Sequence, residues 1–313
     1  MNVSTFISRR TTFATDAGEI AYTEFGGATA GKPPTAQLPG AQLPGAQPSA
    51  GQLPTAQLPA ALFVHGLGTN GALWRHVIEQ VADTTRCVAI DLPGHGGTPS
   101  RDDLSVTALA GTLTELCDGL GLDQVDLVGN DTGGAVAQIF AGRHPGRIRT
   151  LTLTNCDTDG NFPTPEFAPI IDLAKQGQMA EMLATVVGDP GSWRTSPLVG
   201  GYEHPDSIPD ESLACYFEPV GGTIEKARTF ERMLASLDPA DLSAVTGALR
   251  ALTAPTLIVW GTGDTAFGVK WAHQLRDTIP GARDVVEIEG AKTFFPEERP
   301  SDLVPHLRSL WGR

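Results

Sequence analysis

The chain has 313 residues, a formal net charge of −14 at pH 7, 41% hydrophobic residues and 19% charged residues. This composition is typical of a folded globular protein and excludes a wholly disordered chain. The negative charge, together with the lack of a Lys/Arg cluster, argues against a nucleic-acid partner and against binding to anionic membranes.

No segment has the pattern of a membrane span or a secretory signal, because no apolar run approaches ~20 residues and residues 1–10 lack an apolar stretch. We therefore expect a cytoplasmic protein. The four cysteines are far apart and include no Cys-x-x-Cys pair, which favours free thiols over a disulfide or zinc framework. We expect no metal and no cofactor, and nothing in the pattern specifies the oligomeric state.

The first 60 residues predict a hairpin followed by an insert. Residues 8–15 and 20–25 read as two strands around the turn at 16–18. Residues 28–60 repeat Ala-Gln-Leu-Pro and contain seven of the 24 prolines. Proline at about every fifth residue removes backbone donors and prevents both helix and sheet, so we expect a loop insert outside the core.

From residue 60 onward, short apolar runs alternate with helical segments, as in a parallel doubly wound α/β sheet. The predicted strands are 61–64, 87–91, 125–129, 148–155, 256–260 and 285–288. The predicted helices are 71–82, 106–120, 133–144, 269–279 and 301–311. Residues 158–250 interrupt the rhythm with broadly helical sequence, which predicts a cap, or lid, over the carboxyl edge of the sheet. The α/β core is then formed by residues 1–157 and 251–313.

The sequence Gly-Asn-Asp-Thr-Gly-Gly at 129–134 lies between a predicted strand and a predicted helix. Small residues on either side of Asp131 allow a sharp turn that pushes its side chain into the crevice. A phosphate-binding loop is excluded because no Lys-Ser/Thr pair follows the glycines. The chain contains no Gly-x-Ser-x-Gly motif, which makes a serine esterase or lipase improbable.

Two loops after predicted strands complete this region. At 65–68, the Leu67 N–H and the N–H of Thr132 would form a two-donor pocket for an anion. We interpret His65 as a residue that orients this loop, and His95 as one that holds the turn at 91–97. Burial should raise the pKa of Asp131 while the helix N-terminus and the two donors lower it, so we expect an ionised carboxylate at pH 7.

With these motifs, and with Trp-Gly-Thr-Gly-Asp at 260–264, the chain resembles the α/β-hydrolase superfamily, specifically its aspartate-nucleophile branch of epoxide hydrolases and haloalkane or haloacetate dehalogenases. The resemblance covers nearly all of the chain except the insert. It implies that Asp131 is the nucleophile and Asp264 the acid, with Asp157 as an alternative acid. In that family a histidine follows the last strand, but this chain has Thr293 at that position.

The missing histidine puts ordinary turnover in doubt. The family's nucleophile forms an ester that a histidine-activated water then hydrolyses, and such general-base help is worth roughly 10²–10⁴-fold. Threonine cannot accept a proton near neutral pH. We considered His204 in the cap and Lys292 beside Thr293 as replacement bases.

The family's epoxide hydrolases use two cap tyrosines to protonate the epoxide, and Tyr202 and Tyr216 lie in the predicted cap. Cap aromatics suggest a neutral, apolar substrate. Further residues that we expect to line the site are His65, Asn130, Cys156, Asp157, Trp193 and Phe267.

Three functions stay open at this point. The first is a hydrolase that attacks an epoxide or carbon–halogen bond with Asp131. The second is a non-hydrolytic enzyme in which Asp131 is an acid or base for elimination, cyclisation, ring opening or isomerisation of a bulky metabolite. The third is a ligand-binding pseudoenzyme. In each case the partner is a small molecule.

Overall fold

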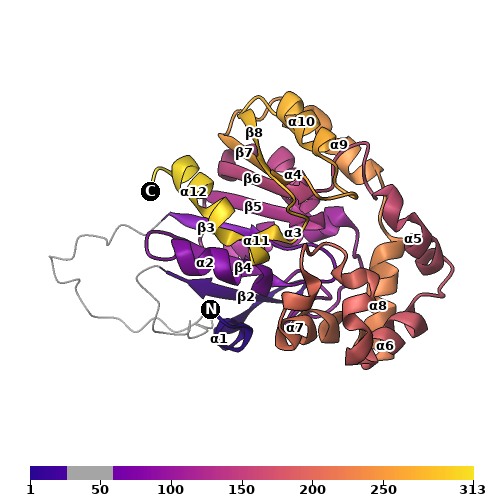
Figure 1. Cartoon of the computed structure of the whole chain (residues 1–313). Helices are drawn as coiled ribbons and strands as arrows, with labels where there is room; N and C mark the ends of the chain where they lie inside the picture. Colours follow the sequence, from indigo (N-terminus) through magenta and orange to yellow (C-terminus); the bar gives the residue numbers. More distant parts are fainter. Residues whose placement is uncertain (27–58) are drawn as a thin grey trace, which may run out of the picture.

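The computed structural model of the chain describes residues 1–26 and 59–313 (Figure 1). The predicted insert at 28–60 lies outside the described residues, except for Pro59 and Ala60, and Ala60 is already the first residue of a strand. Within the described ranges, no helix combines the length and the hydropathy needed to cross a lipid bilayer.

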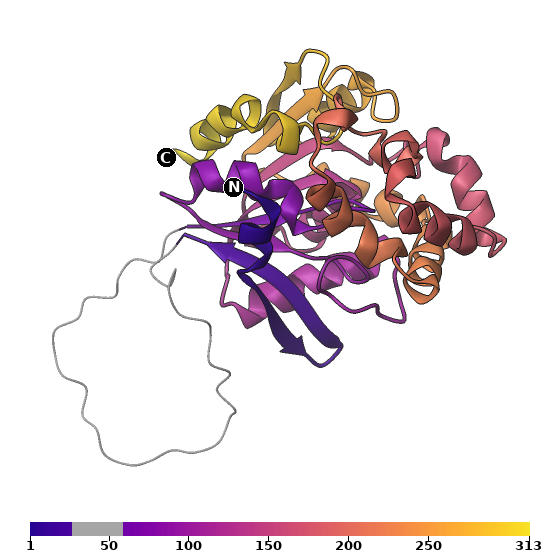
Figure 2. The same ribbon diagram turned by 60° about the horizontal axis from the view of Figure 1, so that its bottom comes forward.

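The described residues form a mostly parallel eight-stranded sheet with the order β1-β2-β4-β3-β5-β6-β7-β8. Strands β1 and β2 form the predicted antiparallel hairpin, β2 pairs antiparallel with β4, and every later pair is parallel. The strands are β1 Arg10–Thr15, β2 Gly18–Phe25, β3 Ala60–Val64, β4 Arg86–Ile90, β5 Val125–Asp131, β6 Ile148–Cys156, β7 Thr256–Gly261 and β8 Ala282–Ile288. Figure 2 shows the hairpin at one edge of the molecule.

The α-helices follow the predicted order, with two short additions that the sequence analysis missed. These additions are α1 Val3–Ile7 and α11 Phe295–Glu298. The predicted helix at 71–82 begins as the 3₁₀ turn η1 Gly71–Trp74 and continues as α2 Arg75–Val81. The other core helices are α3 Val106–Gly119, α4 Thr132–Arg143, α10 Val269–Thr278 and α12 Pro300–Trp311, with the 3₁₀ turn η2 Pro145–Arg147.

The central strands carry apolar side chains on both faces because helices cover both faces. Every residue of β3 and β5 is buried, as is typical of a parallel sheet between two helical layers. On one side α4 contacts β3, β5 and β6 and packs against α3, while α2 and α12 pack together on the other (Figure 1). This arrangement fixes the carboxyl ends of β3, β5 and β6 close to one another.

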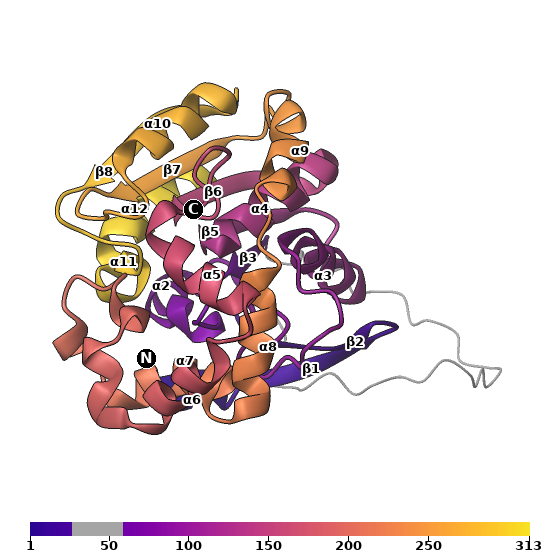
Figure 3. The same cartoon turned by 90° about the vertical axis from the view of Figure 1, so that its right-hand side faces the viewer.

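The segment between β6 and β7 is helical, and no residue from 158 to 250 is in a strand. It contains α5 Ala168–Lys175, α6 Ala180–Gly188, α7 Asp210–Gly221, α8 Ile224–Ala235 and α9 Ala240–Leu249, with the 3₁₀ turns η3 Pro165–Phe167, η4 Pro190–Thr195, η5 Pro197–Val199 and η6 Pro205–Ser207. Figure 3 shows α5 to α8 grouped together. Helix α9 instead packs on α4, where Val245 lies against Gly142. We therefore propose that the cap ends before α9 rather than at residue 250.

Gly26, the last described residue before the insert, shows at which edge of the sheet the insert begins. Gly26, which follows β2, lies against the carbonyl oxygens of Ala82 and Thr85, just before β4. This is the edge of the sheet opposite to the carboxyl ends of the parallel strands. We therefore expect deletion of residues 33–58 to leave the melting temperature and the catalytic rate nearly unchanged, as checked by a thermal melt and an activity assay. A loss of either would contradict this expectation.

Candidate active site

Asp131 lies at the sharp strand-to-helix turn that the sequence predicted. It is the last residue of β5, and Thr132 is the first residue of α4. Its φ of 54° lies in the left-handed region, where a residue with a side chain is strained. The side chain is 9% exposed. The turn therefore holds one carboxyl group at the carboxyl edge of the sheet.

Glycines allow this turn to pack tightly. A Cβ at Gly133 would overlap the backbone of Val64 and His65, and one at Gly129 would lie 2.6 Å from the Gly133 carbonyl oxygen. A Cβ at Gly66 would overlap the Asp131 carboxyl itself. The glycines at 66, 129 and 133 are therefore needed for the position of Asp131 rather than for chain flexibility.

The two expected anion donors both face Asp131. The backbone N–H groups of Thr132 and Leu67 hydrogen-bond to its carboxyl group and lower its pKa. Their effect is smaller than that of burial, which raises this pKa well above its ordinary value, and the charges of Asp157 and Asp264 raise it further. The sequence-based expectation weighed burial against the two donors but left out the two acidic neighbours, whose charges also raise this pKa.

Asp157 is the acidic neighbour with the larger effect on Asp131. Thr132 bridges the two residues: its N–H donates to Asp131, and its hydroxyl donates to Asp157 Oδ2 over 2.8 Å. Burial raises the pKa of Asp157 to about 7, and the Thr132 hydroxyl partly opposes this. Burial therefore raises the pKa of both carboxyl groups, and the Asp157 charge raises that of Asp131 further.

Thr293 lies where the resemblance implies a histidine, and it contacts the implied acid. Its hydroxyl donates a hydrogen bond to Asp264 Oδ2. The same oxygen accepts the Asn155 amide over 3.2 Å, and Asp264 Oδ1 accepts the Phe267 N–H over 2.9 Å. Phe267 thus supports Asp264 through its main chain, while its own side chain is buried.

His65 and His95 hold the loops around the site, as expected. The Leu92 N–H donates to His65 Nε2, which leaves the His65 proton on Nδ1, 2.7 Å from the Gly66 carbonyl oxygen. The Gly68 N–H donates to His95 Nε2 over 3.1 Å. Burial lowers the pKa of both rings, that of His95 to about 4. Both histidines are therefore neutral supports for the loop that presents the Leu67 N–H.

Asn130 and Cys156 flank the turn without an open face to a substrate. Asn130 Nδ2 donates to the Thr154 and Thr293 carbonyl oxygens, which ties β5 to β6 and to the loop that carries Thr293. Cys156 is fully buried against Gly134, and burial raises the pKa of its thiol well above the ordinary value. Both residues support the site, and neither is placed as a nucleophile.

The two cap tyrosines are not positioned to protonate a substrate at Asp131. Both hydroxyls donate to Glu297 Oε2, that of Tyr202 over 2.7 Å and that of Tyr216 over 3.0 Å. Glu297 also pairs with Arg75 at 2.6 Å, and all four side chains are buried. A buried ion pair holds both hydroxyls, which favours packing of the cap as the role of the two tyrosines over protonation of a substrate.

Three other expected site residues lie elsewhere or lack a catalytic contact. Trp193 is buried within the cap, where it packs edge-on against Phe217 and donates its indole N–H to the Val187 carbonyl oxygen. His204 is 71% exposed and lies 3.5 Å from Glu203, so its ring faces solvent rather than Asp131. Lys292 is half-buried beside Thr293.

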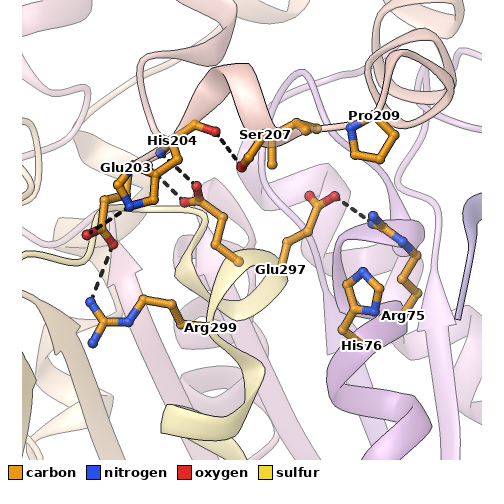
Figure 4. Close-up of a pocket in the computed structure, with 10 residues that line it drawn as sticks. Arg75, His76, Glu203, His204, Ser207, Pro209, Glu297 and Arg299 are labelled. Atoms are coloured by element: carbon orange, nitrogen blue, oxygen red, sulfur yellow. Dashed lines mark hydrogen bonds and ion pairs between the residues drawn. The ribbon is translucent and has the colours of Figure 1, made fainter.

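A separate cavity of about 450 Å³ opens at the junction of the cap and the core. Figure 4 shows Glu297 pointing to Arg75 on one side of it, and His204, Glu203 and Arg299 on the other. The carboxyl groups that line it are already engaged, because Glu298 accepts the N–H groups of Glu203 and His204. Asp131 is not among the lining residues.

Sequence reasoning missed two groups at this junction, Arg75 and Glu297. They are 222 positions apart, and no local pattern links them. Sequence reasoning also did not predict that Asn155 donates a hydrogen bond to Asp264. A φ of 20° in a residue other than glycine marks Asn155 in the structure.

Comparisons with known proteins agree with the fold described above. Residues 59–299 match a family described as alpha/beta hydrolase fold. Epoxide hydrolase 3 of Xenopus tropicalis is 39% identical over 265 residues, which cover 80% of this chain and 70% of that protein. Epoxide hydrolase 1 of Caenorhabditis elegans is 27% identical over 269 residues, and the match spans 64% of its length.

Haloalkane dehalogenases are also similar to this chain. Haloalkane dehalogenase 2 of Mycobacterium bovis is 28% identical over 264 residues, which cover 80% of this chain and 87% of that protein. The crystal structure of the haloalkane dehalogenase DbeA from Bradyrhizobium elkani superposes with a TM-score of 0.74 at 22% identity, covering 97% of each chain. At this identity the structural likeness shows the fold alone.

Proposed function

The chain belongs to the alpha/beta hydrolase fold family, and we propose that it opens an epoxide-type carbon–oxygen bond of a neutral, apolar small molecule. In this proposal Asp131 and Asp157 are the acid and the base. The named epoxide hydrolases among the relatives support the substrate class. The cap residue Phe230, whose ring packs edge-on against His95, brings an apolar side chain to the loops around Asp131 and supports an apolar substrate.

One observation carries the choice of acid–base chemistry. Thr132 joins Asp131 and Asp157 through its N–H and its hydroxyl, and burial raises the pKa of both carboxyl groups, that of Asp157 to about 7. A protonated carboxyl can donate to a leaving oxygen, and an ionised neighbour can accept a proton from a nucleophile. The position that would carry a deacylating histidine holds Thr293, which already donates to Asp264.

The proposed step balances without a covalent intermediate. The Asp131 carboxyl gives its proton to the epoxide oxygen as that oxygen leaves carbon. A hydroxyl group, from water or from the substrate itself, bonds to the same carbon and gives its proton to Asp157. The proton then passes from Asp157 to Asp131, which restores the starting state. The N–H groups of Leu67 and Thr132 stabilise the Asp131 carboxylate while it carries the charge.

A second candidate is attack by the Asp131 carboxylate on an epoxide or carbon–halogen bond. The two N–H donors on Asp131 favour it, because they would stabilise the oxyanion formed when the resulting ester is hydrolysed. This route needs an ionised Asp131 and a base for deacylation. Without that base the ester on Asp131 would accumulate.

A single-turnover experiment in ¹⁸O-labelled water separates the two routes. The enzyme, in excess, is mixed with styrene oxide or 1-chlorohexane, and both the product and the intact protein are weighed by mass spectrometry. Under acid–base opening by water, we expect the first product molecule to contain ¹⁸O and the protein mass to stay unchanged. Opening by a substrate hydroxyl gives neither label nor adduct, and would be seen with an epoxide that also carries a hydroxyl group, such as 4,5-epoxypentan-1-ol.

The covalent route predicts a different result. The first product molecule would take its new oxygen from Asp131 and stay unlabelled, or the protein would gain the mass of the probe at Asp131. Either result would replace the acid–base proposal with the covalent one. Failure of every probe to react or to form an adduct would contradict both routes.

A further inference from the structure

Helix α8 of the cap packs on two of the loops around the candidate site. On this helix, Thr229 and Met233 each come within 3.3 Å of the place that a Cβ would take at Gly94, in the loop after β4. Phe230, on the same helix, comes within 3.9 Å of the corresponding place at Gly68, in the loop after β3. One stretch of the cap therefore contacts both loops.

The loop after β3 joins the Phe230 ring to the Asp131 carboxyl group. The Leu67 N–H hydrogen-bonds to this carboxyl group. The next residue, Gly68, faces Phe230 and donates its N–H to His95 Nε2 over 3.1 Å. The His95 and Phe230 rings pack edge-on, with their centroids 5.8 Å apart. The two rings therefore lie beside the loop whose N–H faces the carboxyl group.

A groove of about 240 Å³ adjoins the same two rings. It is lined by the glycines on either side of His95 and by Thr229, which precedes Phe230 on α8. The two aromatic residues are buried and are not among the residues that line the groove. The packed rings therefore lie between the groove and the loop after β3.

The groove suits an uncharged carbon chain. None of the described residues that line it is acidic, and Pro99 and Pro219 supply apolar surface. The Thr98 hydroxyl and Lys226 Nζ, which also belong to the lining, each donate to a main-chain carbonyl oxygen. The larger cavity beside Glu297 is lined by arginine and glutamate side chains, so it suits such a chain less well.

We propose that Phe230 is a specificity-determining residue that limits the chain length of the substrate, because its ring closes the way from the Asp131 carboxyl group to the groove. A smaller side chain at position 230 would join the two spaces, and a longer apolar chain would then extend along α8 into the groove. This inference rests on the proposed function for the class of substrate. Its test measures binding and requires no reaction.

The test compares two diols that correspond to the ring-opened products of terminal epoxides, 1,2-hexanediol and 1,2-decanediol. Isothermal titration calorimetry measures the dissociation constant of each. In the wild-type protein we expect the longer diol to bind no more tightly than the shorter one, because Phe230 blocks its additional methylenes. Each methylene that becomes buried is worth about fourfold in affinity, so in Phe230→Ala we expect the longer diol to bind at least about tenfold more tightly than the shorter one.

Two further variants control this comparison. Phe217→Ala removes the same side chain from another buried position of the cap, where Phe217 packs against Trp193. It should keep the wild-type ratio of the two dissociation constants. Phe230→Leu retains an apolar side chain, which protects the test against a loss of the fold, and it should give an intermediate ratio. A melting curve for each variant shows that the protein is folded.

An unchanged ratio in folded Phe230→Ala and Phe230→Leu would overturn the inference, and so would an equal change in Phe217→Ala. A lack of binding of both diols to every variant would also overturn it. Failure of the proposed function is a separate result. It would appear as unreacted epoxide in the single-turnover experiment, whatever the diol titrations show.

Discussion

Asp131→Asn is expected to lower the rate of substrate conversion by about 10²- to 10⁴-fold, which is the usual contribution of a positioned acid or base. The asparagine side chain has nearly the same shape, and it can still accept the N–H groups of Leu67 and Thr132 that now reach Asp131. The loss would therefore come from the missing acidic proton of the carboxyl group rather than from a rearranged turn. Conversion of styrene oxide, followed by chromatography of the product, measures it.

Asp157→Asn is the matched variant for this measurement. If Asp157 is the base, its loss should reduce the rate to a similar degree, because acid and base act in one step. A large effect at Asp131 with little effect at Asp157 would favour covalent attack by Asp131. Full activity in Asp131→Asn would remove Asp131 from the chemistry altogether.

Glu297→Ala is expected to lower the free energy of unfolding by about 3–5 kcal/mol, the typical cost of breaking a buried ion pair by removing one partner. Arg75 would keep its charge, since the side chain that pairs with Glu297 at 2.6 Å is only 4% exposed. The hydroxyls of Tyr202 and Tyr216 would also lose their acceptor. Urea denaturation measures the change.

Two further variants serve as controls for the effect of Glu297→Ala. Glu297→Gln retains an acceptor for the tyrosine hydroxyls and should lose less stability than Glu297→Ala. Glu289→Ala removes an exposed glutamate from the loop before Thr293 and should change the free energy of unfolding by no more than about 0.5 kcal/mol. Equal stability of Glu297→Ala and Glu289→Ala would show that the buried pair does not stabilise the fold.

The sheet could be predicted because each strand is marked by residues that are adjacent in the sequence. Apolar runs such as Ala60–Val64 and the glycines around Asp131 mark strands and the sharp turn within a few residues of sequence. The short helices α1 and α11 have too few residues to show a helical period, and α11 also contains Pro296. The pattern of apolar residues therefore could not predict these two helices.

The candidate site was predictable only where one segment determines it. The positions of Asp131, Thr132 and the Leu67 loop could be predicted from the small residues that form each turn. The ionisation of Asp131 does not, because Asp157 and Asp264 reach it from two other strands. The partner of the two cap tyrosines could not be predicted for the same reason, because Glu297 is 95 positions from Tyr202.

The buried histidines and the buried carboxyl pair also affect how the fold responds to acid. Asp157, whose pKa rises to about 7, favours the folded state when it is protonated; that contribution is complete below about pH 4 and is lost as the pH rises to about 7. His95, whose pKa falls from 6.5 to about 4, favours the folded state when it is neutral; that contribution is complete above about pH 6.5 and is lost as the pH falls to about 4. Between about pH 4 and about pH 7, a rise in pH therefore lowers the free energy of unfolding through Asp157 and raises it through His95. Acidification thus strengthens the contribution of Asp157 to the free energy of unfolding while it weakens that of His95.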